Sequence, residues 1–296
     1  MAIYHLSIKT VKRSTGRSAV AAAAYRTATN LIDDRTGQTY DYTRKQGVEF
    51  SEILIPKTAP RNLSERNALW DSAEAAEKRK NSVTAREYEI AFPAEFNDEQ
   101  KQACVHEFSH WLVDRFAVGV DVAIHAPHRE GDQRNYHAHI LTTTRAIDST
   151  GLAKKTRELD EKNSGAVIEV RGKWAEIANR HLEQANVTDR IDHRSHKDRG
   201  IEAAPTFHLG VMAAAMERRG LETDRGNQLR FILAANKALQ IARLAHMALL
   251  HQMKQVARKS VEALSAAGNI LLNRNKRQTE NVPAKSKSRM KPSLEK

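Results

Sequence analysis

Two neighbouring segments, VGVDVAIH (118–125) and YHAHILTTT (136–144), alternate between large apolar residues and small or polar ones for much of their length. A period of two is the spacing of a β-strand, whose successive side chains point to opposite faces of a sheet. The pattern therefore predicts two strands, each with one apolar face. The histidines lie on the other face: His125 in the first strand, and His137 and His139 in the second.

Three imidazoles on one face of adjacent strands are a suitable donor set for a divalent metal. If the two strands pair antiparallel, His125 lies beside His137 and His139. Three nitrogen ligands form a half-shell that leaves coordination positions open for substrate oxygens. A single strand histidine is usually structural, whereas three that converge on one face favour a metal site.

A third alternating segment, REYEIAFP (86–93), turns its tyrosine, isoleucine and phenylalanine to one face and Glu87 and Glu89 to the other. Either carboxylate can accept a hydrogen bond from a ligating histidine or bind the metal directly. The alternative is a solvated strand face. The sequence does not choose between the two carboxylates, because they share a face.

The charge of the chain favours a polyanionic partner. Lys and Arg number 48 against 36 Asp and Glu, a formal net charge of +12. Such an excess indicates nucleic acid or an anionic membrane surface, the alternative being a merely soluble basic protein. No stretch approaches the roughly 20 apolar residues that span a bilayer, and the single Cys104 fits a reducing compartment. We expect a cytoplasmic protein without membrane insertion that binds DNA or RNA.

A nucleophile for phosphate chemistry is available in Tyr25. It lies in the Ala-rich segment 19–31, which is predicted to be a helix with Ser18 as its N-cap. Small neighbours let this helix pack closely on a sheet and bring the phenol towards the metal. A free phenol has a pKa of about 10, so attack requires activation by the metal or a nearby base. Ordinary packing of Tyr25 is the alternative role, and Tyr40 and Tyr42 are alternative nucleophiles.

These segments resemble the MobA/MobL family of mobilisation relaxases, within the wider HUH endonuclease class. The resemblance covers most of residues 1–225. It is carried by MAIYHLSIKT, SAVAAAAYR, EYEIAFP, AIHAPH, NYHAHIL, WAEIANRHLE, IDHRSHKDRGIE and FHLGVMAAAMERRG.

The resemblance implies an α/β (α+β) fold, with a ferredoxin-like antiparallel sheet of the HUH relaxase type packed with helices. It also implies Mg²⁺ or Mn²⁺ on His125, His137 and His139. Tyr25 would attack a phosphodiester of single-stranded DNA at a plasmid origin of transfer. It would keep the 5′ end as a phosphotyrosine and free a 3′ hydroxyl, and reversal would reclose the strand.

The same resemblance implies roles for further residues and partners. Glu87 or Glu89 would support the metal or its histidines. Accessory mobilisation proteins and a type IV secretion coupling protein are the implied partners, with export of the protein alongside the DNA into a recipient cell. Four basic residues near the proposed centre are expected to contact phosphates: Arg13, Arg17, Arg26 and Arg134.

Three regions are expected along the chain. Residues 1–225 form the relaxase domain. Residues 226–272 contain no proline and carry apolar residues at helical spacing, which predicts one long helix or a helical hairpin near Gly268. Residues 273–296 are rich in Lys and Arg and are expected to form a disordered basic tail.

Two other functions are compatible with parts of the pattern. Rolling-circle replication initiators use the same three-histidine chemistry, but their tyrosine follows the histidines, and here no tyrosine follows His137. A non-catalytic basic DNA-binding adaptor would bind DNA without forming a covalent adduct. Adduct formation therefore separates an enzyme from an adaptor.

Two further histidine clusters are alternative candidates for a metal site. The segment HEFSH (106–110) matches the H-E-x-x-H pattern of zinc proteases, but it lies in a helix predicted over 98–116. Its histidines fall roughly opposite the apolar stripe of that helix, which disfavours a structured cleft. His193, His196 and His208 lie in a basic stretch, and we favour loop structure and DNA contact over metal binding there.

Overall fold

The computed structural model describes residues 4–207 and 209–280. The chain divides into two compact units, Met1–His193 and Arg194–Lys296. The first unit therefore ends before residue 225, the boundary predicted for the first domain. Within the described ranges, no helix has both the length and the apolar character needed to cross a lipid bilayer.

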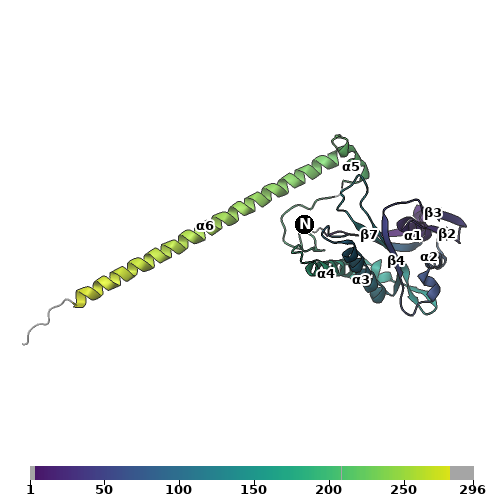
Figure 1. The fold of residues 1–296 in the computed structure, drawn as a ribbon, viewed down its shortest axis with the longest axis horizontal. Helices are drawn as coiled ribbons and strands as arrows, with labels where there is room; N and C mark the ends of the chain where they lie inside the picture. Colours follow the sequence, from purple (N-terminus) through teal and green to yellow (C-terminus); the bar gives the residue numbers. More distant parts are fainter. Residues whose placement is uncertain (1–3, 208, 281–296) are drawn as a thin grey trace, which may run out of the picture. The chain divides into compact units, whose positions relative to one another are not determined.

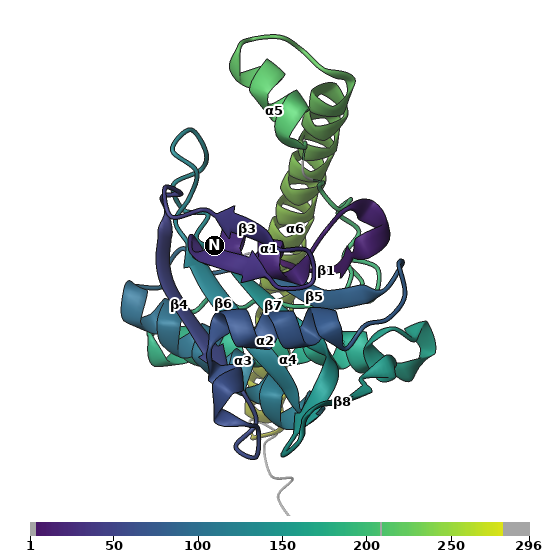
Figure 2. The same ribbon diagram turned by 90° about the vertical axis from the view of Figure 1, so that its right-hand side faces the viewer.

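Figure 1 labels helices α1 to α4 of the first unit. This unit is built on a sheet in which neighbouring strands follow the order β1-β5-β7-β6-β4, while β8 pairs with the end of β7 (Figure 2). Every pairing in it is antiparallel. A separate hairpin is formed by β2 (Asn30–Asp33) and β3 (Gln38–Asp41). The sheet strands are β1 (Leu6–Lys12), β4 (Val48–Leu54), β5 (Val83–Ala91), β6 (Val118–His125), β7 (His137–Asp148) and β8 (Gly151–Lys155).

Helices cover both faces of this sheet. Figure 2 shows α1 and α2 in front of the sheet and α3 and α4 behind it. The helices of the first unit are α1 (Ala19–Thr27), α2 (Arg66–Ala75), α3 (Asp98–Phe116) and α4 (Ala166–Gln184), with short 3-10 turns at Arg13–Thr15, Arg61–Ser64, Arg157–Leu159 and Lys162–Ser164. The predicted α+β fold with an antiparallel sheet packed by helices is confirmed.

The larger core lies between the sheet and the α3–α4 layer. The apolar positions of β6, including Val120 and Val122, are fully buried there, together with Phe108 of α3 and Trp174 of α4. Burial of such side chains contributes about 1.5–3 kcal/mol each. Because the apolar residues of β6 and β7 face this core, the alternate positions, including the histidines, face the α1 side.

On the α1 side the packing is close because α1 is rich in alanine. Ala19, Ala23 and Ala24 are fully buried. The predicted N-cap is confirmed, since the Ser18 side chain accepts a hydrogen bond from the backbone N–H of Ala21. The helix is shorter than predicted: a left-handed residue, Ala28, ends it, and the chain turns directly into β2.

Asp121 lies on the same face of β6 as His125, but its carboxylate has a structural role. Its buried carboxylate accepts hydrogen bonds from Arg66 Nε at 2.9 Å and from the indole Nε1 of Trp70 at 2.8 Å. Burial raises the pKa of Asp121, against the lowering effect of Arg66 and of these hydrogen bonds. The carboxylate therefore ties α2 to the sheet and is not a fourth metal ligand.

Replacing Asp121 by Ala is expected to destabilise the first unit by about 3–5 kcal/mol, because it leaves Arg66 without its buried partner. The free energy of unfolding from urea titration measures this loss. Asp114→Ala is a suitable control, since Asp114 is exposed on α3. Equal losses in the two variants would show that the ion pair does not hold α2 to the sheet.

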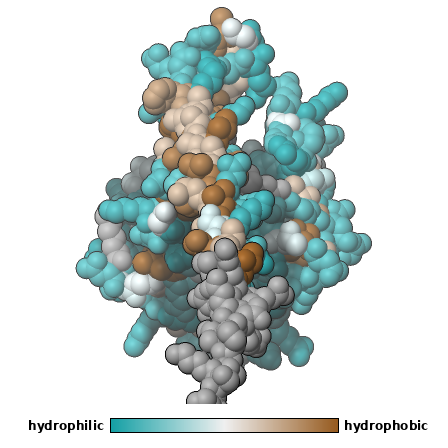
Figure 3. Space-filling model, turned by 90° about the vertical axis from the view of Figure 1, so that its left-hand side faces the viewer, coloured by the Kyte–Doolittle hydropathy of each residue, from teal (hydrophilic) through white to brown (hydrophobic). Residues whose placement is uncertain are grey.

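The second unit contains α5 (Val211–Arg218) and α6 (Asp224–Glu280). Helix α6 continues through Gly268, so the structure has the long helix and not the hairpin. Residues 273–280, predicted as tail, are helical in the structure, and they contain neither proline nor glycine. The rest of the predicted tail lies outside the described residues. Figure 3 shows brown apolar patches on this unit, and Phe231 and Leu264 of α6 are both 74% exposed.

Candidate metal centre and nucleophile

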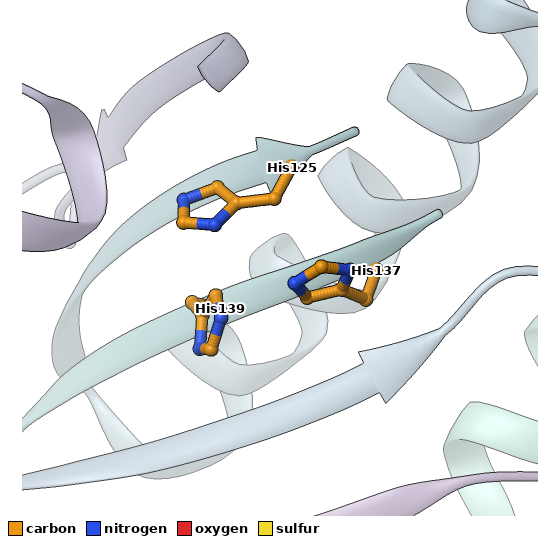
Figure 4. A group of neighbouring side chains, drawn as sticks. All are labelled: His125, His137 and His139. Carbon is orange, nitrogen blue, oxygen red and sulfur yellow. The ribbon is translucent and has the colours of Figure 1, made fainter. Parts of the chain in front are cut away.

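The three predicted histidines converge on one face of the sheet (Figure 4). His125 at the end of β6 pairs directly with His137 at the start of β7, and His139 lies two residues further along β7. The ring centroids are 4.7–5.4 Å apart. One nitrogen from each ring lies within 4.8 Å of the others, and in the described part of the chain no other group of His, Cys, Asp or Glu is arranged to share a metal ion.

Hydrogen bonds fix the orientation of the two β7 histidines. Nδ1 of His139 donates to Oε1 of Glu87 at 2.7 Å. Nδ1 of His137 donates to the backbone carbonyl of Asn135 at 3.0 Å. In each ring the proton is thereby placed on Nδ1, which leaves Nε2 as the basic nitrogen. A ligating histidine typically has such an oxygen partner on its other nitrogen.

The third histidine is held from helix α1. Nε2 of His125 donates to the backbone carbonyl of Arg26 at 2.6 Å, which leaves Nδ1 as its basic nitrogen. Burial lowers the pKa of His125 to about 3, against the opposing effect of the Arg26 carbonyl. Burial also lowers the pKa of His137. Neutral imidazole is the form that binds a metal, so the donor set fits a divalent ion at neutral pH.

The two carboxylates of β5 have different surroundings. Glu87 is 2% exposed and accepts hydrogen bonds from His139 and from the guanidinium of Arg26 at 2.6 and 3.0 Å. Although burial opposes its ionisation, these hydrogen bonds hold the pKa of Glu87 far below the ordinary value. Glu89 instead forms an ion pair with Lys9 and is 27% exposed. The structure therefore brings Glu87, and not Glu89, into hydrogen-bonding contact with a histidine of the cluster.

Tyr25 lies in the last turn of α1, directly before Arg26. Its side chain is 44% exposed, so it is not a core residue. The ring of Tyr42 packs edge-on against it, with centroids 5.2 Å apart. Because the Arg26 carbonyl binds His125, the end of α1 that carries Tyr25 is fastened beside the three histidines.

Lys45 is a neighbour of Tyr25 that sequence reasoning missed. Its ammonium lies 4.1 Å from the centroid of the Tyr25 ring and donates to the Tyr25 backbone carbonyl at 2.8 Å. Burial lowers the pKa of Lys45 to about 8, with a further contribution from the charge of Arg26. No local pattern marks Lys45, which lies in the turn after the β2–β3 hairpin.

Two of the four arginines expected to contact phosphates are engaged inside the protein. The guanidinium of Arg13 donates to the Glu74 carboxylate and to the backbone carbonyls of Glu74 and Glu77. Arg13 therefore holds the turn after β1 to the end of α2, and its donors are not available for DNA. Arg26 is committed to Glu87. The sequence could not show this, because each partner acid lies 61 residues away.

The other two arginines are exposed. Arg17 lies in the turn before α1. Arg134 is 77% exposed in the loop that joins β6 and β7, where it pairs with Asp132. Both positions are compatible with phosphate contact, and Arg134 is close in sequence to His137.

The protease-like pattern on α3 is not organised as a metal site. His106 Nδ1 lies 2.8 Å from Oε1 of Glu52 on β4. Glu107, which would be the base of a protease, instead binds Arg180 and His181 of α4. These residues connect α3 to its neighbours, in agreement with the sequence-based preference against a protease.

The remaining histidine cluster is divided between the two units. His193 ends the first unit, where its ring lies beside Gly172 of α4. His196 donates to the backbone carbonyl of Ala203 in the second unit. His208 lies outside the described residues. The described pair therefore has local structural contacts, as expected for loop residues.

The sequence of this chain is similar to those of mobilization proteins. The chain is 42% identical over 253 residues to the mobilization protein MobL of Acidithiobacillus ferridurans, covering 76% of this chain and 66% of the relative. It is 30% identical over 284 residues to the probable mobilization protein MobA of Bifidobacterium longum, covering 82% of this chain and 49% of the relative. The chain thus spans 66% and 49% of the length of these two relatives.

A solved structure described as "Molecular Basis of Vancomycin Resistance Transfer in Staphylococcus aureus" is similar in fold and sequence. It matches with a TM-score of 0.59 and 32% identity, over 66% of this chain and 100% of that one. The family model for the MobA/MobL family matches residues 17–219, which include the histidine cluster, Tyr25 and Glu87. On these matches, this chain belongs to the MobA/MobL family.

Proposed function

We propose that the chain is a plasmid-mobilisation relaxase, which cuts and rejoins one DNA strand at an origin of transfer. Tyr25 is the nucleophile, and a divalent ion, Mg²⁺ or Mn²⁺, is held by the three histidines. One observation carries the proposal: the backbone of Arg26 holds His125, while its side chain holds Glu87. The turn with the phenol is thereby coupled to the metal centre at two points. The names of the mobilisation-protein relatives support this function.

The proposed reaction exchanges one phosphate ester for another. The ion, when bound, supplies a Lewis acid that polarises the scissile phosphate. The hydroxyl of Tyr25 gives up its proton to solvent as its oxygen bonds to phosphorus, and the bond between phosphorus and the 3′ oxygen breaks. The 3′ oxygen takes up a proton as a free hydroxyl, and the 5′ end remains on Tyr25. Because an ester replaces an ester, the reverse attack by the 3′ hydroxyl recloses the strand.

Residues around the nucleophile have supporting roles in this proposal. Lys45 and Arg26 flank the ring of Tyr25 at 4.1 and 5.2 Å from its centroid, and their charges attract the phosphate that Tyr25 attacks. Glu87 orients His139 and keeps its proton on Nδ1. Arg17 and Arg134 contact phosphates of the bound strand.

The proposed substrate is single-stranded DNA at the origin of transfer. Accessory mobilisation proteins and a type IV secretion coupling protein are the proposed partners, with action in the bacterial cytoplasm and export alongside the DNA. A rolling-circle initiator would act instead at a replication origin. The position of Tyr25 before the histidines and the mobilisation relatives favour the relaxase.

A covalent-adduct experiment tests this function. The full chain with Mn²⁺ is incubated with single-stranded oligonucleotides that tile the origin of transfer. We expect a protein–DNA product that survives denaturing electrophoresis and that disappears when the metal is chelated. Binding without any adduct would identify the adaptor. Adducts confined to replication-origin oligonucleotides would identify the initiator.

A further inference from the structure

Helix α6 of the second unit carries apolar side chains along one side, and Figure 3 shows brown apolar residues on this helix. These residues are spaced so that they share a side of the helix, because residues three and four apart are neighbours on a helix surface. Their exposed fractions lie between 43% for Leu250 and 74% for Leu264. The name α6 stripe is used below for the six large ones: Leu249, Leu250, Met253, Val256, Val261 and Leu264.

The α6 stripe continues a side of the helix against which the chain itself packs. Near the start of α6, the side-chain amide of Asn236 donates to the backbone carbonyl of Ala204 at 2.8 Å and accepts from its N–H at 2.9 Å. Seven residues later, Arg243 pairs with Glu202 at 2.9 Å. Residues seven apart lie on almost the same side of a helix. That side therefore continues, at the same interval, as Leu250, Ala257 and Leu264.

The apolar side is long enough for pairing with another helix. From His246 to Ala267 its positions carry no Lys, Arg, Asp or Glu, and apolar residues recur at steps of three or four over about three heptads. A pattern sustained over this length indicates a coiled coil. Helices in proteins gain most of their stability from packing of their apolar face. We therefore expect a partner to cover the α6 stripe.

The residues between the large side chains favour a helix over a lipid surface as that partner. Ala257, Ser260 and Ala267 lie on the same side of α6. Small residues of this kind let two helices approach closely and leave holes that receive the leucine and methionine side chains of the other helix. Helices that lie in a membrane surface typically insert Trp, Phe and Leu, and the segment 244–270 contains neither Trp nor Phe.

The charges beside the α6 stripe indicate how two copies fit together. One edge carries Lys254 and Arg258, and Glu262 on that edge is already paired with Arg258 at 3.0 Å. The other edge is uncharged and is formed by Ala245, Gln252 and Ala263. In a parallel pair each basic edge lies beside the uncharged edge of the other helix, whereas an antiparallel pair brings the two basic edges to the same side. The surface is thus electrostatically complementary to itself in the parallel orientation.

We propose that the α6 stripe joins two copies of this chain as a parallel helical dimer. A second copy supplies an apolar side of identical length and spacing, as a two-fold interface requires. Residues 281–296 cannot supply such a helix, because they contain Pro283 and Pro292. The pairing requires no metal, no DNA and no Tyr25, so it goes beyond the proposed relaxase function and does not depend on it.

The mass of the full chain in solution tests the proposal. Light scattering coupled to size exclusion, at micromolar concentration without DNA, is expected to give twice the mass of one chain. The variant L250E/L264E places two carboxylates in the apolar seam of each copy. Because burial of unpaired charge is unfavourable, we expect its dissociation constant for the dimer to rise by about 100-fold or more.

I241E/L244E is the matched control. It introduces the same charges on the opposite side of α6, where Ile241 and Leu244 are 59% and 61% exposed, and we expect it to remain a dimer. Circular dichroism verifies that both variants keep their helix content. A monomeric wild-type chain, or equal weakening in the two variants, would overturn the proposal. So would a monomeric chain whose binding to anionic lipid vesicles is lost in L250E/L264E, since that result would assign the α6 stripe to a membrane.

Disulfide cross-linking tests the parallel orientation. The natural Cys104 is the one cysteine of the chain and is buried, so an introduced thiol reacts without background. A parallel pair brings position 253 and position 260 each opposite its own copy, close enough for a disulfide. With copper phenanthroline as oxidant, we expect covalent dimers from both M253C and S260C and none from Q252C. An antiparallel pair can bring at most one of the two positions opposite itself, so cross-linking of one variant alone would contradict the parallel dimer.

Failure of this proposal is distinguishable from failure of the relaxase function. The mass and cross-linking experiments contain no DNA, so their outcome is the same whether or not the chain cuts a strand. If the wild-type chain forms no covalent adduct with origin DNA, the relaxase proposal fails and the dimer is still measured. If the adduct forms on a monomeric chain, only the dimer proposal fails.

Discussion

Replacing Tyr25 by Phe is expected to abolish the covalent adduct with origin DNA, lowering its rate of formation by more than about 1000-fold. The substitution removes one hydroxyl, and with it the atom that bonds to phosphorus. Since the side chain is 44% exposed, the free energy of unfolding should change by less than about 0.5 kcal/mol. Denaturing electrophoresis after incubation with Mn²⁺ measures the adduct.

Tyr42→Phe is the matched control for this experiment. It removes the same hydroxyl from the ring that packs edge-on against Tyr25. We expect the adduct to form at close to the wild-type rate, because the ring contact is retained. Loss of the adduct in Tyr42→Phe and its persistence in Tyr25→Phe would show that Tyr42, and not Tyr25, is the nucleophile. Mass spectrometry of the modified peptide would identify the residue directly.

Replacing Glu87 by Gln is expected to weaken Mn²⁺ binding by about 10–100-fold, the usual effect of losing the oxygen partner of a ligating histidine. The neutral amide no longer attracts the Nδ1 proton of His139. It also faces the guanidinium of Arg26 with a donor where an acceptor is needed. Isothermal titration of the full chain with Mn²⁺ measures the affinity.

Glu89→Gln is the comparison that makes this result specific. Glu89 lies on the same strand face but binds Lys9, so we expect its loss to change the Mn²⁺ affinity by less than about threefold. A loss for Glu89→Gln equal to that for Glu87→Gln would contradict the assigned role. Urea titration without metal checks the fold, because Glu87→Gln leaves Arg26 without its charged partner.

Local patterns in the sequence were sufficient to predict much of the fold. Alternation in 118–125 and 136–144 predicted two strands with their histidines on one face, and the observed register places His125 opposite His137. The helix predicted over 98–116 has those bounds in the structure. Such predictions succeed because strand and helix geometry repeat over a few residues, so a side chain's face follows from its position.

The long-range partners were decided by the tertiary structure alone. Glu87 and Glu89 have the same alternation, and only the packing of α1 gives Glu87 the contacts with Arg26 and His139. In the same way, Lys45 reaches the ring of Tyr25 through the turn after the β2–β3 hairpin. Arg13, predicted to meet DNA, is bound to Glu74 instead.

The physical reason is distance along the chain, because backbone geometry relates near neighbours whereas side-chain contacts join residues that are far apart in sequence. Backbone geometry fixes which face of a strand a residue occupies, and for the histidines this was enough once the two strands paired. Which charge or hydrogen-bond partner meets that residue depends on segments that are distant in the chain, brought together by burial of their apolar faces. From the amino-acid sequence alone, the three histidines of the proposed metal centre could therefore be placed on one face, whereas the contacts of Glu87 and the surroundings of Tyr25 could not be predicted.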